Sequence, residues 1–179
     1  MKTTISIILF LSACSWGGTE NNGLVIETNS FPIQEELVKT VFQIVETNWN
    51  NRFSDDLDLI SLAENEGLFV EYVSNLPARG QFYSDSMMIR IHFSEPNDSD
   101  PEEWTEEDRI VAHCIDNYYV LGHELLHFIT FVWTNDYVAG SHNVSNVFLQ
   151  WAVDNNEPLN ETVEFDVFLA VQAAICSQD

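Results

Sequence analysis

The spacing of apolar residues predicts a helix followed by a small sheet in the first half of the chain. The helix carries its apolar residues at helical intervals, at Ile33, Leu37, Val41, Ile44 and Val45, as far as Trp49. Residues 68–73 have the β-branched and aromatic content of a strand, and residues 80–83 and 87–93 bracket a short polar turn, which predicts a hairpin. Residues 24–27 are a further candidate strand, whereas residues 57–63 fit either a helix or a strand.

One long apolar segment dominates the second half of the chain. It follows an acidic loop over residues 97–107, which contains Thr105 with Asp108 three positions on, a spacing typical of a capping box. A helix is therefore predicted to begin at Thr105 or at Asp116 and to end near Trp133. Because this helix is apolar nearly all round, we expect it to lie at the centre of the fold.

The remaining segments complete a single predicted domain over residues 24–179, preceded by a flexible tether at 14–23. Turns after the central helix lead to an apolar run through Trp151, and a last helix is predicted over residues 161–176. The sequence thus predicts an α+β fold. A small mixed or antiparallel sheet packs on the central helix, and further helices lie at its N- and C-terminal sides.

The central helix contains the pattern H-E-x-x-H, formed by His123, Glu124 and His127. Residues four apart on a helix lie about 40° apart around the axis, so both imidazoles can bind one metal ion. In zinc peptidases the Glu of this pattern takes a proton from the metal-bound water. A buried helix whose histidines only form hydrogen bonds is the structural alternative, but burying three ionisable side chains without a metal is costly.

A catalytic zinc usually has three protein ligands, so the sequence must supply one more. His142, in the loop after the central helix, is the preferred candidate because imidazole is a good zinc ligand. Three glutamates further along the chain could serve instead: Glu157, Glu161 and Glu164. Asp136, or no third protein ligand, also remains open.

Over roughly residues 68–151 the chain resembles zincin-type metallopeptidases, and among them poorly characterised bacterial lipoproteins with H-E-L-x-H and a downstream His. The resemblance implies a zinc ion bound by His123, His127 and provisionally His142, with Glu124 as general base. It also implies a zincin-like fold and hydrolysis of peptide bonds. The metzincin extension is absent, since that pattern needs Gly and His where this chain has Thr130 and Trp133.

The resemblance further implies that an edge strand of the sheet aligns the substrate backbone, and residues 87–93 are the candidate strand. It does not identify the group that stabilises the oxyanion. Tyr137 and His92 are candidates for that role, although each is first interpreted as an ordinary loop or strand residue. His113 is interpreted as structural, because it lies on a different face of the helix from His123.

The first thirteen residues are typical of an export signal, with Lys2 before an apolar stretch over residues 5–11. The sequence L-S-A-C that ends at Cys14 resembles a bacterial lipobox, which implies cleavage before Cys14 and its lipidation. Ser15 resembles the sorting signal for the outer membrane. We therefore expect a protein of the bacterial cell envelope, anchored by lipid and not spanning the membrane.

The chain is strongly acidic, with 29 Asp and Glu against 6 Lys and Arg and a net charge of −23. A field of this sign repels nucleic acid, which is excluded as a natural partner. Asp98 and Asp100 lie in the acidic loop, but their spacing lacks the pattern of a calcium-binding loop, so a solvated helix cap is the preferred interpretation.

Cys114 and Cys176 remain once Cys14 is assigned to the anchor, and an even pair in an exported protein predicts a disulfide. Such a bond would close a loop of about sixty residues and add about 3 to 4 kcal/mol of stability. Two buried thiols that never meet are the alternative, because sequence separation does not determine geometry.

The function predicted from these observations is that of a lipid-anchored zinc metallopeptidase acting on peptides or proteins at the cell envelope. The main alternative is a non-catalytic zinc-binding lipoprotein, or pseudo-peptidase, that binds a partner. A zinc-dependent hydrolase of non-peptide amides is a third possibility. The sequence contains nothing that specifies the oligomeric state.

Overall fold

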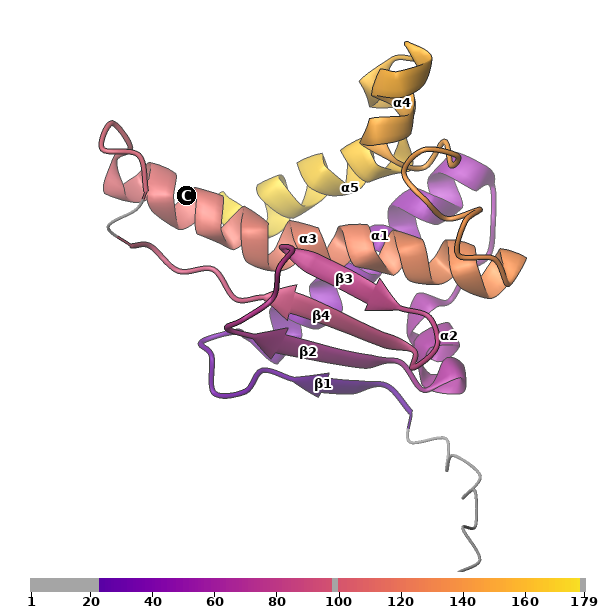
Figure 1. The fold of residues 1–179 in the computed structure, drawn as a ribbon, viewed down its shortest axis with the longest axis horizontal. Helices are drawn as coiled ribbons and strands as arrows, with labels where there is room; N and C mark the ends of the chain where they lie inside the picture. Colours follow the sequence, from indigo (N-terminus) through magenta and orange to yellow (C-terminus); the bar gives the residue numbers. More distant parts are fainter. Residues whose placement is uncertain (1–22, 98–99, 178–179) are drawn as a thin grey trace, which may run out of the picture.

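A four-stranded mixed sheet forms one side of the molecule (Figure 1). Its strands are β1 (Val25–Glu27), β2 (Phe69–Val73), β3 (Gly80–Tyr83) and β4 (Met88–His92), in the spatial order β1-β2-β4-β3. β1, β2 and β4 run parallel, and β3 runs antiparallel to β4. This computed structural model describes residues 23–97 and 100–177, so the predicted export signal and the lipidated Cys14 lie outside the described residues.

The prediction that residues 87–93 form an edge strand is wrong, because β4 lies inside the sheet and pairs with both β2 and β3. Its composition explains the position, since Ile89 and Ile91 are both fully buried, whereas β3 has Phe82 as its one buried residue. The more apolar strand of the hairpin therefore occupies the interior. β3 is the edge strand beside the central helix.

Alternate side chains of the sheet face the helices. Val70, Tyr72, Ile89 and Ile91 are fully buried, whereas their neighbours along β2 and β4 are partly exposed. On the exposed face, Glu71 and Arg90 are directly paired across β2 and β4 and form an ion pair of 2.9 Å. One face of the sheet is thus a core face, as period-two alternation requires.

Three helices form the first part of the helical layer: α1 (Glu35–Phe53), α2 (Leu59–Glu66) and α3 (Glu106–Thr134). The ambiguous segment over residues 57–63 is therefore helical, with Asp58 as its N-cap. α3 begins at the earlier of the two predicted starts because Thr105 and Asp108 form a reciprocal capping box. α3 packs against β3 and β4 on one side and against α1 on another.

The C-terminal part of the chain folds back over α1 and α3 (Figure 1). It contains α4 (Leu149–Asn155), a 3-10 turn (Leu159–Glu161), α5 (Val163–Val171) and a π-helical turn (Gln172–Cys176). α5 runs directly into the π-helical turn, so the helix predicted over 161–176 is present from Val163 to Cys176. Gly122 allows α5 to approach α3 closely, since a Cβ atom there would lie 2.8 Å from Cγ1 of Val167. A disulfide joins Cys114 of α3 to Cys176.

The α+β class is confirmed, with a mixed sheet against a long central helix and flanking helices. Within residues 23–97 and 100–177, none of the helices is long and apolar enough to cross a bilayer.

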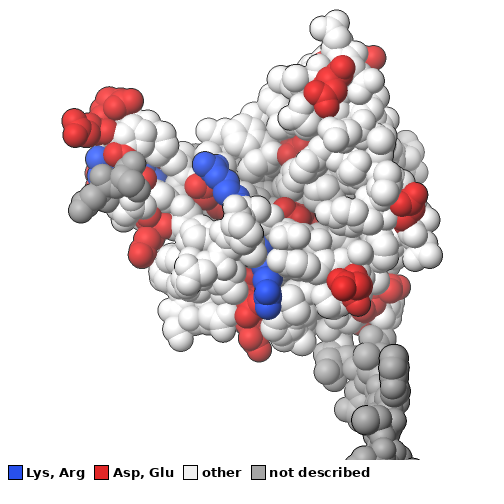
Figure 2. All heavy atoms as spheres, in the orientation of Figure 1, with Lys and Arg blue, Asp and Glu red and all other residues white. Residues whose placement is uncertain are grey.

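Basic side chains are few on the face drawn in Figure 2, and large areas of that face carry no charged residue. Most basic side chains of the described part of the chain are held by carboxylates, in the ion pairs Lys39–Glu35, Arg52–Asp166, Arg79–Asp116 and Arg90–Glu71. Free acidic groups therefore dominate the electrostatic field of the protein, which has a net charge of −23.

Candidate metal centre

Three imidazoles from two segments of the chain meet at one point. Nε2 of His142 lies 2.9 Å from Nε2 of His123 and 3.0 Å from Nε2 of His127. One ligand nitrogen from each residue falls within a group whose members all lie within 4.8 Å of one another. The cluster could hold a metal ion.

Local structure explains how His142 reaches the two residues on α3. The helix ends at Thr134, and the capping residue Asn135 adopts a left-handed conformation with φ 51° that turns the chain back along the helix. Gly140 then passes close to α3, since a Cβ atom there would lie 3.3 Å from Cβ of Thr130. The missing side chain at position 140 lets the loop carrying His142 lie against the face of α3 that carries His123 and His127.

The hydrogen bonds of the second ring nitrogens fix the tautomers of His123 and His127. Nδ1 of His127 lies 2.8 Å from the carbonyl oxygen of Gly140, which can only accept, so Nδ1 carries the proton. Nδ1 of His123 lies 2.6 Å from Oε1 of Glu164 and donates to that carboxylate. Both Nε2 atoms are then unprotonated, and both direct a lone pair towards His142.

Glu164 of α5 is the partner that orients His123. Its Oε1 also accepts from the hydroxyl of Tyr119 at 2.5 Å, and its Oε2 accepts from the backbone N–H of Leu149 at 2.6 Å. Burial raises the pKa of Glu164, but the hydrogen bond and charge of His123 outweigh that effect and lower it. The carboxylate of Glu164 is therefore engaged by donors and does not occupy the third ligand position.

The remaining acidic candidates for the third ligand lie away from the cluster. Glu157 and Glu161 are exposed, on either side of Pro158 at the surface. Asp136 accepts a hydrogen bond from the backbone N–H of Val138 within its own turn. Among the candidate third ligands, His142 is the one that the structure brings to His123 and His127.

The three ring nitrogens lie close enough together to hold one metal ion. Zinc binds imidazole nitrogen at about 2.0–2.1 Å, so two ligands of a tetrahedron lie roughly 3.3 Å apart. The Nε2–Nε2 distances from His142 to its two partners, 2.9 and 3.0 Å, are slightly shorter. Metal-binding histidines usually donate their other N–H to a carboxylate or a backbone carbonyl, which are the two partners found here. Three protein ligands leave a fourth position open.

The pKa values of the three histidines differ because their surroundings differ. Burial lowers the pKa of His127 to about 3, and the neighbouring His123 and His142 act in the same direction. Burial also lowers the pKa of His142. Burial likewise tends to lower the pKa of His123, but the hydrogen bond and charge of Glu164 outweigh it and raise that pKa above its usual value.

Glu124 lies beside the cluster with little exposure to solvent, its residue being 5% exposed. Burial raises its pKa to about 7, and the nearby His123 partly opposes that rise. Gly80 at the start of β3 lies directly over this side chain, because a Cβ atom there would be 2.9 Å from Oε1 of Glu124 and 2.5 Å from Cγ1 of Val120. The bare backbone of Gly80 thus brings the edge strand against Glu124.

A hollow of about 470 Å³ opens onto this site, and we call it the metal-site hollow. It contains the candidate ligands His123 and His142 together with Glu124 and Glu164. The rest of its wall comes from Arg79, Gly80, Ile115, Asp116, Tyr119, Val120 and Phe168. Phe148 stacks beneath His127, with ring centroids 4.4 Å apart. The cluster thus rests on an apolar base and opens towards solvent.

The two candidates for oxyanion stabilisation do not line this hollow. Tyr137 stacks on His127 from outside, with ring centroids 6.4 Å apart, and is 49% exposed. His92 lies on β4, where its Nδ1 is buried and has no hydrogen-bond partner among the described residues. Tyr137 therefore lies against a candidate ligand but outside the residues that line the hollow.

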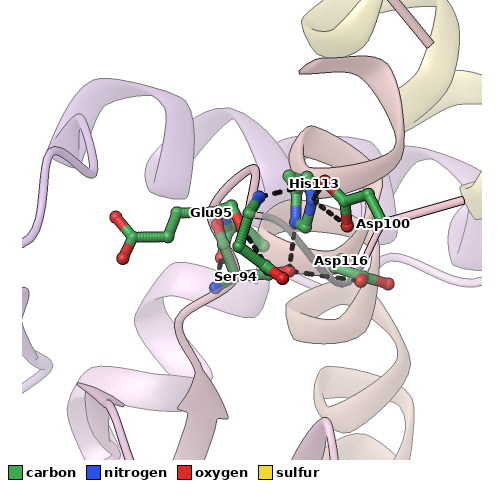
Figure 3. Close-up of polar contacts among 7 residues, drawn as sticks. Ser94, Glu95, Asp100, His113 and Asp116 are labelled. Carbon is green, nitrogen blue, oxygen red and sulfur yellow. Dashed lines mark hydrogen bonds and ion pairs between the residues drawn. The ribbon is translucent and has the colours of Figure 1, made fainter. Parts of the chain in front are cut away.

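His113 is part of a separate polar cluster, shown in Figure 3. Its Nε2 lies 3.1 Å from both carboxylate oxygens of Asp100, and its Nδ1 lies 2.5 Å from Oγ of Ser94. Oγ of Ser94 also contacts Asp116 at 3.4 Å. His113 therefore ties the acidic loop and the end of β4 to α3. Asp98, the second acidic residue weighed for calcium, lies outside the described residues.

Sequence reasoning missed the residues that support the ligands. Tyr119 carries no motif, and the sequence pattern presents Glu164 only as a direct ligand. Gly140 precedes His142 by two residues, and its presence in a loop after the helix that carries H-E-x-x-H was the available signal for a close approach. The partner of an Nδ1 atom depends on which helix crosses α3, and no local pattern encodes that crossing.

Comparison of the chain with models of known protein families, with curated proteins and with solved structures gave no match.

Proposed function

We propose that this protein is a zinc-dependent metallopeptidase that hydrolyses peptide bonds. The observation that carries the proposal is the convergence of three Nε2 atoms at an open hollow that also contains Glu124. A metal centre with a purely structural role is usually closed by four protein ligands, whereas a catalytic centre keeps one position for water or substrate. The three-histidine set and the hollow beside it are typical of the catalytic kind.

Zinc bound here would supply a Lewis acid, which polarises a carbonyl group and acidifies a coordinated water molecule. His123, His127 and His142 would hold it. Glu124 would accept a proton within the hollow and return it to the leaving amine. A pKa of about 7 suits both steps, because near neutral pH the side chain exists in both protonation states.

The free edge of β3 is the proposed place for the substrate backbone. β3 is paired with β4 on one side only, and among the described residues no further strand covers its other edge, although Glu124 accepts a backbone hydrogen bond from Phe82. A peptide can add to such an edge through main-chain hydrogen bonds, without contributions from particular side chains. Gly80 brings this edge next to Glu124, so a peptide bound there would lie beside the general base.

The test combines metal content with turnover on the purified domain. The unaltered protein should bind one zinc per chain and cleave a mixture of unstructured peptides. Glu124→Gln should keep the zinc and lose at least about a hundredfold in kcat, the lower range of a general-base effect. His142→Ala should lose zinc. Zinc binding with no hydrolysis of any peptide would instead support a non-catalytic zinc-binding protein, and the peptidase proposal would be withdrawn.

We also propose that lipid on Cys14 anchors this peptidase at the bacterial cell envelope, on the outer membrane. The disulfide between Cys114 and Cys176 supports this location, because such bonds persist in oxidising compartments outside the cytoplasm. Cys14→Ser should release the protein from the membrane fraction and abolish incorporation of labelled fatty acid. Membrane association unchanged by that substitution would refute the anchor.

A further inference from the structure

We propose that Arg79 determines substrate specificity by binding a carboxylate on the C-terminal side of the cleaved bond. This inference rests on the proposed peptidase function and adds a substrate class to it. The preferred substrates would be short peptides that end in a free carboxylate, or peptides with an acidic side chain at the same place. Arg79 immediately precedes β3 and lines the metal-site hollow.

Arg79 stands where the metal-site hollow meets a second one. The adjoining hollow, of about 380 Å³, shares Arg79, Ile115 and Asp116 with the first, and its far wall includes Trp104 and Asp100. A substrate that extends from the metal centre towards the N-terminal end of α3 must therefore pass Arg79. In the described part of the chain, no other Lys or Arg side chain lines either hollow.

The guanidinium of Arg79 has donors to spare. Its side chain is 76% exposed, and its one ion pair joins Nη1 to Oδ1 of Asp116 at 2.5 Å. A guanidinium has five N–H donors, so most of its donor capacity is available to a ligand. The backbone of Arg79 is fixed, because its carbonyl oxygen accepts from the N–H of His92 at 2.8 Å. Asp116 and this backbone bond together hold the side chain over the junction of the hollows.

The distance from the metal centre to Arg79 suits a short peptide. Asp116 and His123 are seven residues apart on α3, which places them about 10 Å apart along nearly the same face of the helix. An extended peptide advances about 3.4 Å per residue, so this distance corresponds to roughly three residues. Arg79 is therefore within reach of the second or third residue beyond the cleaved bond.

The direction of β3 indicates which end of the peptide reaches Arg79. Antiparallel pairing is the slightly more stable arrangement of two strands. A peptide that pairs antiparallel with β3 runs opposite to Gly80–Tyr83, so its C-terminal end lies next to Gly80. Arg79 directly precedes Gly80. The group presented to the guanidinium is thus a C-terminal carboxylate or a side chain close to it.

The net negative charge of the protein favours basic substrates over acidic ones. The carboxylates that line the metal-site hollow, however, already have partners or are buried. Glu164 is occupied by three donors, and Glu124 is buried beneath Gly80 with its residue 5% exposed. Asp116 is already paired with Arg79. The group in the hollow with unused hydrogen-bonding capacity is therefore the guanidinium of Arg79, which is a donor. It binds a carboxylate at short range, although the overall field of the protein repels anions.

The experiment compares three zinc-loaded proteins on three peptides of one sequence. The first peptide ends in a free carboxylate two residues beyond the cleaved bond, and the second is its C-terminal amide. The third is also amidated but has Glu as its last residue. Wild type should cleave the free acid with a kcat/KM about twofold to fivefold above that of the plain amide, as expected for an ion pair with a guanidinium exposed to solvent. The third peptide shows whether an acidic side chain serves as well.

Arg79→Gln should lose this preference through a higher KM for the free acid, so that its kcat/KM on the free acid falls to that on the amide. Arg90→Gln is the matched control, since Arg90 lies on the exposed face of the sheet, and it should behave as wild type. Binding of the free acid and the amide to zinc-loaded Glu124→Gln protein, with and without Arg79→Gln, gives a readout independent of turnover.

The outcomes separate the two proposals. Wild type that cleaves none of the peptides, and binds none as Glu124→Gln, would refute the peptidase function itself. Cleavage with equal rates on acid and amide would leave the peptidase standing and overturn the role of Arg79. Wild type that cleaves an amidated peptide with Lys as its last residue faster than the one with Glu would also overturn it, because the carboxylates of the hollow would then be the recognising groups.

Discussion

Replacing Glu164 by Gln should weaken zinc binding without unfolding the protein. Glu164 accepts three hydrogen bonds, from His123 and Tyr119 on Oε1 and from Leu149 on Oε2. An amide has one acceptor oxygen and a donor NH2 group. With its oxygen towards His123, the amide directs NH2 at the N–H of Leu149. In the reverse orientation it loses both His123 and Tyr119.

At least one buried donor is therefore left unpaired in Glu164→Gln, which should lower the free energy of unfolding by about 1–3 kcal/mol. His123 also loses the negative partner that orients its ring and increases its basicity. Loss of such a partner typically costs tenfold to a hundredfold in metal affinity, or about 1.4 to 2.7 kcal/mol. The zinc dissociation constant should therefore rise by that factor, with the stoichiometry unchanged.

Competition with a chromophoric chelator measures this dissociation constant, and thermal denaturation of the metal-free protein measures the stability. Glu157→Gln is the control, because it makes the same chemical change at an exposed position. If Glu164→Gln bound zinc within twofold of wild type, then His123 would not depend on Glu164 for its orientation, and the assignment of supporting residues would be wrong.

Three further predictions concern stability and pH. Replacing both Cys114 and Cys176 by Ser should lower the free energy of unfolding by about 4 kcal/mol, since the bond closes a separation of 62 residues, and chemical denaturation under oxidising conditions checks this value. Gly122→Ala should cost about 1–3 kcal/mol by overpacking against Val167, which lowers the melting temperature, whereas an unchanged one would contradict the close approach of α5 to α3. Zinc affinity should fall as the pH decreases through the pKa of His123, because only neutral imidazole binds the metal. The carboxylate of Glu164 raises that pKa, and zinc titrations at several pH values test the direction of the effect.

The sequence predicts α3 and its capped start because the information is local. Thr105 and Asp108 lie three residues apart, and the reciprocal hydrogen bonds between them need no distant partner. The helical spacing of His123 and His127 likewise follows from the pattern itself. His142 could be proposed as the third ligand but not chosen with certainty, since the turn that returns it to α3 depends on Asn135 and on the contact of Gly140 with Thr130.

Strand order and the support of the ligands could not be obtained from local patterns. The hairpin of β3 and β4 is predictable, but either strand of a hairpin can pair with β2, and the burial of Ile89 and Ile91 decides between them. Glu164 is 41 residues from His123, and α5 must cross α3 to bring them together. Sequence separation also leaves the pairing of Cys114 with Cys176 open.

The disulfide makes the packing around the histidine cluster depend on whether the surroundings are oxidising or reducing. Cys114 and Glu164 belong to the two elements that the bond draws together, because Cys114 lies on α3 and Cys176 follows α5 in the chain. In a reducing medium, packing alone holds α5 on α3, and with it the carboxylate that orients His123. Oxidation adds a covalent link nine residues before His123. The proposed metal centre is therefore held by packing and by a covalent link where the disulfide forms, and by packing alone where it does not.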